Sequence, residues 1–338
     1  MNDKSSNPPQ INLLKRAFSY LLWGLVDISV ILAGAIALFG FAARLSWAAD
    51  MCCQFRVQIM MFLLPATLFY WLLRRGAVAW WLLACLVANV VPMTPYIWPA
   101  ATQVTKDDDG FTRIILMNVL VNNLHHNDVV KYVQEKSPDI FIALEADHNW
   151  TDGLEPLRAS FPHRYLIDDR GTSSLAAYSR IPFDSIETLQ STERRLPSID
   201  MTVTLDGKQL QIVATHPYVP KTEETADLRN EQMQNVAEKM DRTKARMLIG
   251  DFNCAPWSPH FTDMLATANV RPAGYGHGLR PTWYHESRRL GPLNGTWVLG
   301  LMLDHVLIGP NVRASHYSIG PPLGSDHRPI VVDFRLVD

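Results

Sequence analysis

Apolar residues form two different patterns along the chain, and the change between them comes near residue 100. Before it, three long apolar runs with few charges cover residues 18–43, 57–73 and 77–91. A helix of about 20 apolar residues is long enough to cross the hydrocarbon core of a bilayer. We therefore predict a membrane domain with three transmembrane helices over residues 11–98, preceded by a disordered polar tail at residues 1–10.

After residue 110 the apolar runs become short and rich in β-branched residues, and turn-forming residues separate them. Such runs are typical of buried strands, while two longer segments have helical spacing. Residues 99–110 read as a linker before a second domain at residues 111–338. Strands outnumber helices, which favours an α+β fold of stacked sheets with helices outside. The predicted strands are residues 113–119, 140–145, 175–179, 201–205, 210–215, 246–250, 301–307 and 329–334, and the predicted helices are residues 128–136 and 226–242.

Polar residues suited to catalysis stand at or just beyond the ends of these predicted strands. Any one of them alone could be a turn or capping residue, because Asp, Asn and His are common in loops. Their repeated occurrence at strand ends indicates instead that they meet in one site. The set is Asn118, Glu145, His216, Asp251, Asn253, Asp304, Asp326 and His327.

The later residues of this set fall within three short motifs. In chain order these are Gly250-Asp251-Phe252-Asn253, Asp304-His305-Val306, and Ser325-Asp326-His327-Arg328-Pro329. With the residues before them, they make residues 111–336 resemble the endonuclease/exonuclease/phosphatase superfamily. The segments Pro256-Trp257-Ser258-Pro259 and Pro281-Thr282-Trp283 extend the resemblance toward bacterial membrane-bound members. It implies a four-layer α/β/β/α sandwich that hydrolyses phosphoesters with the help of a divalent metal ion.

The same resemblance assigns a role to each residue of the set. It implies that Glu145, helped by Asn118, holds Mg²⁺ or Mn²⁺, which prefer oxygen ligands. Asp326 is a further candidate metal residue. His327 is expected to act as the general base on the attacking water, and Asp304 to orient its ring.

The remaining three residues are expected to act on the phosphoryl group. Asp251 would position the nucleophile or the leaving group. Asn253 and His216 would donate hydrogen bonds to phosphoryl oxygens as negative charge builds on them. For His305, which follows Asp304, a structural role is expected, because successive side chains of a strand face opposite ways.

Charge narrows the range of substrates. After residue 110 acidic residues outnumber basic ones, so this part lacks the positive field with which nonspecific nucleic-acid binders capture phosphate backbones. A lipid or small phosphoester is therefore favoured over DNA or RNA. Separately, the four cysteines, two of them adjacent, do not form a disulfide framework.

Basic residues in short loops predict the orientation in the membrane. Lys15 and Arg16 precede the first apolar run, and Arg74 and Arg75 lie between the second and third, so both places should be cytoplasmic. Three crossings then put the second domain outside the cytoplasm, on the periplasmic face of an inner membrane. The resulting hypothesis is a multi-pass, membrane-anchored phosphodiesterase or phosphatase. Its alternatives are a tethered nuclease and a catalytically inactive membrane scaffold.

Overall fold

The computed structural model describes residues 9–73, 76–98, 110–168, 171–189, 196–285 and 297–338. The chain divides into two compact units, the first ending at Pro92 and the second beginning at Met93. Most of the predicted tail and linker, and the pair Arg74 and Arg75, lie outside the described residues. Residues 9 and 10, predicted as part of the tail, belong instead to the first helix.

The first unit is helical, and the three predicted apolar runs fall on three of its helices. These are α1 (Pro9–Phe39), α3 (Arg56–Leu72) and α4 (Gly76–Val90). Within the described residues, the segments Lys15–Ala42 and Gly76–Ile97 are each long and apolar enough to cross a membrane. A short helix that the apolar pattern did not predict, α2 (Trp47–Gln54), meets α3 at a bend of 66°, and the pair makes a third span if it is counted as one.

Polar contacts between helices fix the packing of this unit. The Tyr70 hydroxyl of α3 donates to Asp27 of α1 at 2.7 Å. The Arg56 guanidinium at the start of α3 donates to the Asn89 side chain of α4 at 3.0 Å and lies over the Phe41 ring. Buried polar groups of this kind have to be paired, so they hold the helices in one register.

Within its described residues, the second unit contains two six-stranded mixed sheets. The first sheet has the order β13-β14-β1-β2-β4-β3, and the second has the order β5-β6-β7-β8-β12-β9. The strands of the first sheet are β1 (Thr112–Asn118), β2 (Ile140–Leu144), β3 (His163–Ile167), β4 (Leu175–Ser179), β13 (Val312–Ile319) and β14 (Ile330–Leu336). Those of the second are β5 (Phe183–Leu189), β6 (Ser198–Leu205), β7 (Lys208–Thr215), β8 (Ala245–Asp251), β9 (Arg271–Pro272) and β12 (Asp304–Ile308). Two short strands, β10 (Trp283–Tyr284) and β11 (Gly300–Leu301), pair with each other in a separate small antiparallel sheet.

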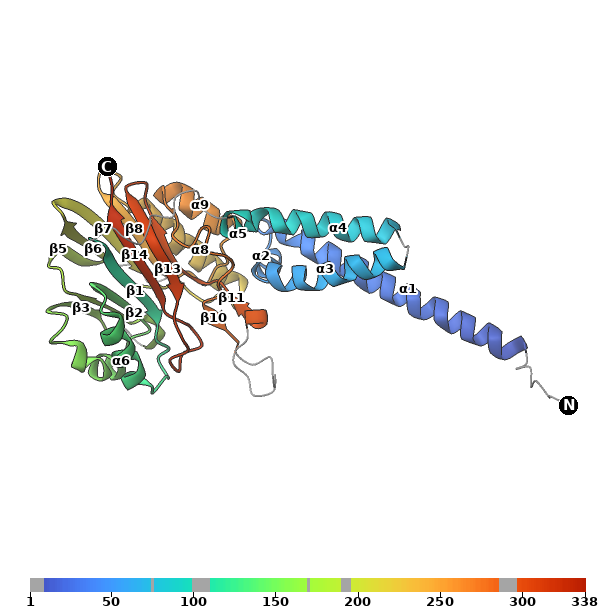
Figure 1. Ribbon diagram of the computed structural model, residues 1–338, viewed down its shortest axis with the longest axis horizontal. Coiled ribbons are helices and arrows are strands. Elements are labelled where there is room, and N and C mark those ends of the chain that lie inside the picture. The colour runs from blue at the N-terminus through green and yellow to red at the C-terminus, as the bar shows by residue number, and fades with distance from the viewer. Residues whose placement is uncertain (1–8, 74–75, 99–109, 169–170, 190–195, 286–296) are drawn as a thin grey trace. The chain divides into compact units, whose positions relative to one another are not determined.

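The two sheets pack face to face, and helices cover their outer faces (Figure 1). The inner faces share one apolar core that draws on both sheets, including Ile142, Ile212 and Val332. Outside the first sheet lie α6 (His126–Lys136) and α7 (His148–Gly153), and outside the second lie α8 (Glu223–Glu238) and α9 (Pro259–Ala268). This arrangement confirms the expected α/β/β/α sandwich.

Strand direction explains why the predicted site residues gather at one edge. Each sheet has one parallel pair, β1 with β2 and β7 with β8, so the carboxyl ends of both strands in a pair reach the same edge. The neighbours β14 and β12 run antiparallel to these pairs, so their amino ends come to that edge as well. In the register of β12 with β8, Asp304 stands directly opposite Asp251.

The second unit begins before its first strand. The short helix α5 (Thr94–Ile97) docks on the loop after β9, where the carbonyls of Pro95 and Tyr96 accept hydrogen bonds from the amides of Gly276 and Gly278 at 3.0 and 2.8 Å. The Tyr96 ring also meets the Tyr275 ring edge to face, with 4.9 Å between the centroids. These contacts tie residues 94–97 to the second unit.

Candidate active site

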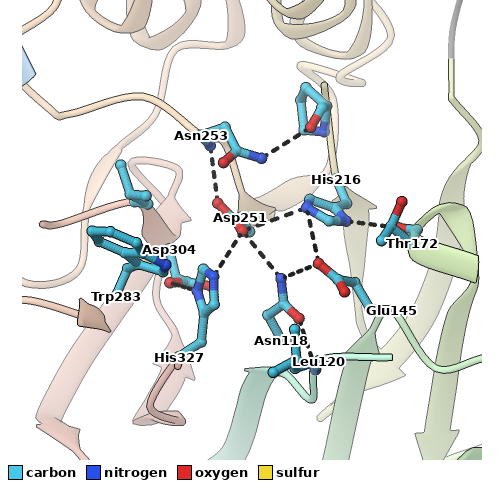
Figure 2. Close-up of polar contacts among 12 residues, drawn as sticks. Asn118, Leu120, Glu145, Thr172, His216, Asp251, Asn253, Trp283, Asp304 and His327 are labelled. Carbon is cyan, nitrogen blue, oxygen red and sulfur yellow. Dashed lines mark hydrogen bonds and ion pairs between the residues drawn. The ribbon is translucent and has the colours of Figure 1, made fainter. Parts of the chain in front are cut away.

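The carboxylate of Asp251 is the meeting point of the site (Figure 2). It is 1% exposed, and its Oδ2 lies 3.2 Å from Asn118 Nδ2, 3.4 Å from His216 Nε2 and 3.5 Å from His327 Nε2. Burial by itself would raise the pKa of Asp251, but the positive charge of His327 and the hydrogen bond from His216 outweigh it and hold the pKa well below its usual range. Asp251 is therefore an anion between two imidazoles.

Gly250 lets β8 deliver Asp251 to this position. A Cβ at Gly250 would lie 1.9 Å from the Thr215 carbonyl oxygen of β7. Since no side chain fits in that space, only glycine allows the two parallel strands to approach so closely at their ends.

His327 is held by a second carboxylate. Its Nδ1 donates to Asp304 Oδ2 at 2.8 Å, which leaves Nε2 facing Asp251. Burial would lower the pKa of His327, but the charges of Asp304 and Asp251 overcome this and raise the pKa to about 10. Positive charge brought to the site would lower that pKa, because these two carboxylates are what raise it.

His216 has its tautomer fixed by the backbone. Its Nδ1 lies 3.0 Å from the Thr172 carbonyl oxygen, and since a carbonyl only accepts, Nδ1 carries a proton. The Nε2 atom then faces Asp251, and Glu145 Oε1 lies 3.9 Å away. Burial opposes a charge on this ring, yet the hydrogen bond and charge of Asp251 raise the pKa of His216. The ring is arranged to donate from Nε2.

Glu145 stands just after β2 in a left-handed conformation with φ 58°. Its Oε1 accepts from Asn118 Nδ2 at 3.0 Å, and its Oε2 accepts from the backbone N–H of Val121 at 3.2 Å. The amide oxygen of Asn118 instead accepts from the N–H of Leu120. Asn118 thus presents its nitrogen, not its oxygen, to the Glu145 carboxylate.

Asn253 and Asp326 also have their side chains engaged. The backbone N–H of Asn253 donates to Asp251 Oδ1 at 2.9 Å, and its Nδ2 donates to the Pro217 carbonyl at 3.1 Å. Asp326 Oδ2 accepts from the Trp283 indole N–H at 2.9 Å. The structure brings Asn118, Glu145, His216, Asp251, Asp304 and His327 into one network, with Asn253 bound to its edge. The Asp326 side chain accepts instead from Trp283, which lies outside that network.

The donor set fits a divalent cation. Asp251, Asp304 and His327 each offer an atom, and these atoms lie within 4.8 Å of one another. Within the described residues, Oδ1 of Asp304 and Oδ1 of Asp326 are buried acceptors without a hydrogen-bond donor. Buried anionic oxygens are costly unless they are paired, and a hard cation is a suitable partner for them.

Several residues that support the site were not predicted from the sequence. The fully buried Arg229 donates to the Asn253 carbonyl at 3.0 Å, and Thr282 Oγ1 accepts from the N–H of Asp304 at 3.0 Å. Ser325 Oγ donates to the Asn118 carbonyl and accepts from the N–H of His327. The only sequence signal for Arg229 was a charged residue on the face of α8 that also carries Ala226 and Met233, both of which are buried.

His305 points away from the site, as expected. Its ring lies against the Phe261 ring at 4.6 Å between centroids and near that of Phe252, and Nε2 contacts the Met302 carbonyl at 3.2 Å. Burial lowers the pKa of His305 to about 4. The ring is therefore neutral in the folded protein at neutral pH.

This pKa predicts an acid-sensitive contribution to stability. The unfolded chain binds the His305 proton near pH 6.5 and the folded chain only near pH 4, so stability is lost as the pH falls through that window, by about 3 kcal/mol in all. In His305→Phe the free energy of unfolding should fall less steeply between pH 6.5 and 4. Denaturant unfolding at several pH values measures this slope. Equal slopes for the two proteins would contradict the assignment, since the other titrating groups are common to both.

Sequence comparison decides the family. The profile of the Endonuclease/Exonuclease/phosphatase family matches residues 116–327, a range that includes every residue of the network. The chain belongs to this family. Enzymes of the family use divalent metal ions to hydrolyse phosphoesters, which agrees with the buried Asp-Asp-His group. No curated protein sequence matches the chain.

Solved structures of the endonuclease/exonuclease/phosphatase fold resemble the second unit. TDP2 of D. rerio in complex with a single-strand DNA product superposes with a TM-score of 0.55 at 18% identity, covering 67% of this chain and 100% of that one. A family member from Beutenbergia cavernae gives 0.54 at 17% identity, with 68% and 72% covered. Sphingomyelinase C from Streptomyces griseocarneus gives 0.50 at 16% identity, with 66% and 99% covered. At these identities the likeness establishes a shared fold.

Proposed function

We propose that this chain is a membrane-anchored, divalent-metal-dependent phosphodiesterase or phosphatase. The observation that carries the proposal is the buried Asp251 carboxylate, whose Oδ2 faces Asn118, His216 and His327 beside the Glu145 carboxylate. A family fold with this network intact has the groups that phosphoester hydrolysis needs. A scaffold protein would have no reason to keep two imidazoles aimed at one buried anion.

His327 is the general base of the proposed reaction. Its Nδ1 donates to Asp304, so the proton of the attacking water goes to Nε2, and Asp304 stabilises the imidazolium that results. Asp251 lies 3.5 Å from that nitrogen, where it can orient the water or the leaving oxygen. The Asp251 carboxylate is fixed by the backbone N–H of Asn253, and the hydrogen bond to Asp304 holds the ring, so the ring does not have to reorient during the reaction.

His216 and Asn118 are the donors for the developing negative charge. The Nε2 atom of His216 and the Nδ2 atom of Asn118 point into the same space, where a phosphoryl oxygen can replace a carboxylate as the acceptor. Asn253 is a further donor at the edge. Bound Mg²⁺ or Mn²⁺ would supply charge neutralisation at the phosphoryl oxygens. We propose that Glu145 and Asp326 would hold the ion, and that Asn118 helps by orienting the Glu145 carboxylate through its Nδ2.

The helical unit is proposed to cross an inner membrane three times, with the catalytic unit on the periplasmic side. Large apolar side chains remain exposed on its helices, among them Tyr20, Leu68 and Trp80, which suits a lipid environment. Membrane attachment and the acidic catalytic part both favour a lipid or small phosphoester as substrate. The alternative is a tethered nuclease, since the similar D. rerio TDP2 was solved with a single-strand DNA product.

A panel of substrates tests this proposal. The detergent-solubilised chain is offered phospholipid head-group esters, small phosphoesters, plasmid DNA and RNA, each with and without Mg²⁺ or Mn²⁺. Metal-dependent hydrolysis of the first two classes is the expected result, and preferential cleavage of DNA or RNA selects the nuclease alternative. If nothing is hydrolysed and His327→Ala behaves like the wild type, the scaffold hypothesis takes over.

Glu145→Gln should chiefly weaken the metal dependence. The amide keeps the shape of the side chain but removes its charge, so we expect half-maximal activity to need on the order of tenfold or more Mg²⁺, with partial rescue at excess metal. The measurement is the rate as a function of Mg²⁺ concentration at fixed substrate. Glu155→Gln, an exposed change in the same unit, serves as the control. An unchanged metal titration for Glu145→Gln would remove this residue from the metal site.

A further inference from the structure

The turn after β1 contains a strained residue next to the proposed metal carboxylate. Leu120 has φ 62°, a left-handed conformation that a leucine rarely adopts because its Cβ crowds the backbone. Strain of this kind persists only where surrounding contacts hold it in place. The contacts that hold Leu120 are therefore informative.

Three hydrogen bonds converge on Leu120. Its N–H donates to Asn118 Oδ1 at 3.0 Å, as Figure 2 shows. Its carbonyl accepts from the N–H of Asn123 at 2.8 Å and from the indole Nε1–H of Trp150 at 3.0 Å. Two of these bonds are local to the turn, and only the bond from Trp150 comes from another element.

The turn at Leu120 also orients the Glu145 carboxylate. The residue after Leu120, Val121, donates its backbone N–H to Glu145 Oε2, and the Asn118 side chain donates to Oε1. Both oxygens of the carboxylate are thus directed by groups whose positions depend on the conformation of Leu120. A change in this turn would change where the carboxylate points.

The Trp150 side chain is tightly packed. It is completely buried, and the backbone N–H of Trp150 donates to Asp147 Oδ1 at the start of α7. The His126 ring packs on its indole at 4.4 Å between centroids, and a Cβ on Gly153 would lie 2.4 Å from His126 Nδ1, so the space is filled. Because α7 begins three residues after Glu145, the contacts close a ring from Glu145 through Trp150 and the turn back to Glu145.

We propose that Trp150 is a positioning residue for the metal-holding carboxylate. Its indole N–H pins the Leu120 turn in its left-handed conformation, and through that turn it fixes Glu145 for binding the divalent cation. The inference rests on the proposed function, in which Glu145 holds the metal. Groups that orient a metal ligand typically change metal affinity on the order of 10- to 100-fold when they are removed.

The test compares Trp150→Phe with Phe161→Leu. The first keeps an aromatic ring but removes the N–H donor, and the second alters the same apolar core without a hydrogen bond to the turn. Thermal unfolding of the detergent-solubilised full chain is followed as Mg²⁺ is added, since a ligand that binds the folded state raises the midpoint. The Mg²⁺ dependence of phosphoester hydrolysis is measured in parallel.

Trp150→Phe is expected to need on the order of tenfold more Mg²⁺ for half of the stabilisation, with a smaller change in the rate at saturating metal. Phe161→Leu should lower the unfolding midpoint without moving the Mg²⁺ requirement. Asp147→Ala, which removes the cap of α7 and leaves the core intact, is the milder variant if Trp150→Phe does not fold. It should shift the requirement in the same direction.

Leu120→Asn in the Trp150→Phe background adds a readout that a packing defect would not move. Asn tolerates the left-handed conformation, so part of the metal response should return. If Trp150→Phe and Phe161→Leu change the Mg²⁺ requirement equally, the proposal for Trp150 is overturned while the proposed function stands. If Mg²⁺ does not stabilise the wild type and the chain hydrolyses nothing, the proposed function itself fails, and the role of Trp150 falls with it.

Discussion

His327→Ala is expected to lower kcat/KM for phosphoester hydrolysis by about 10³- to 10⁴-fold at saturating Mg²⁺, because the attacking water loses its base. Among the described residues, only His327 has one ring nitrogen facing Asp251 and the other hydrogen-bonded to the Asp304 carboxylate. The residual rate would come from the remaining charge-stabilising groups. Steady-state kinetics on the best substrate of the panel measure the loss.

The matched control for this change is His305→Phe. It also removes a buried histidine, but His305 lies on β12 outside the network. It should keep nearly the full rate at pH 8, where the His305 ring is neutral in the folded and unfolded chain alike. A His327→Ala protein that retains more than about a tenth of the wild-type rate is incompatible with general-base catalysis by this residue.

Asp251→Asn should cost about 10³-fold or more in kcat/KM, since it removes the anion that orients both imidazoles. It should also change the pH dependence. Asp251 is one of the charges that raise the pKa of His327 and His216, so without it both pKa values should fall. The pH profile of kcat/KM, recorded for the residual activity, would then show its acid limb at lower pH than in the wild type.

Asp333→Asn provides the comparison for Asp251→Asn. Asp333 accepts two hydrogen bonds from the Arg113 guanidinium, at 2.6 and 2.8 Å, so its loss also breaks a charge pair of the second unit. Stability should fall, but kcat/KM and its pH profile should not change. Similar losses of activity in the two variants would mean that Asp251 acts only by stabilising the fold.

The strands that carry the site were predictable because they are buried on both faces. β2 and β8 are almost wholly buried, so each appears in the sequence as a continuous apolar run with a polar residue at or just after its end. The edge strands gave no such signal. β5 has exposed and half-buried positions and none that is fully buried, and β13 contains Arg313, Ser315 and His316, so neither differs in composition from a loop.

The sequence could predict which polar residues come together, but not how their side chains are oriented. The sequence places Asn118 and Glu145 at the ends of paired strands, yet which atom of the Asn118 amide faces the carboxylate depends on the turn that follows. The contact of Thr172 with His216 joins residues 44 positions apart through a backbone carbonyl, which has no signature in side-chain type. Spacing and composition carry no information about such contacts.

The docking of residues 94–97 determines where a fragment that contains only the second unit should begin. A fragment cut at the first strand would leave the amides of Gly276 and Gly278 without their acceptors and bare one side of the Tyr275 ring. That loop continues to Thr282, which accepts from the backbone N–H of Asp304, so a change in the loop would reach the carboxylate that pairs with His327. A fragment limited to the second unit should therefore start at Met93, so that residues 94–97 can keep their hydrogen bonds with the loop.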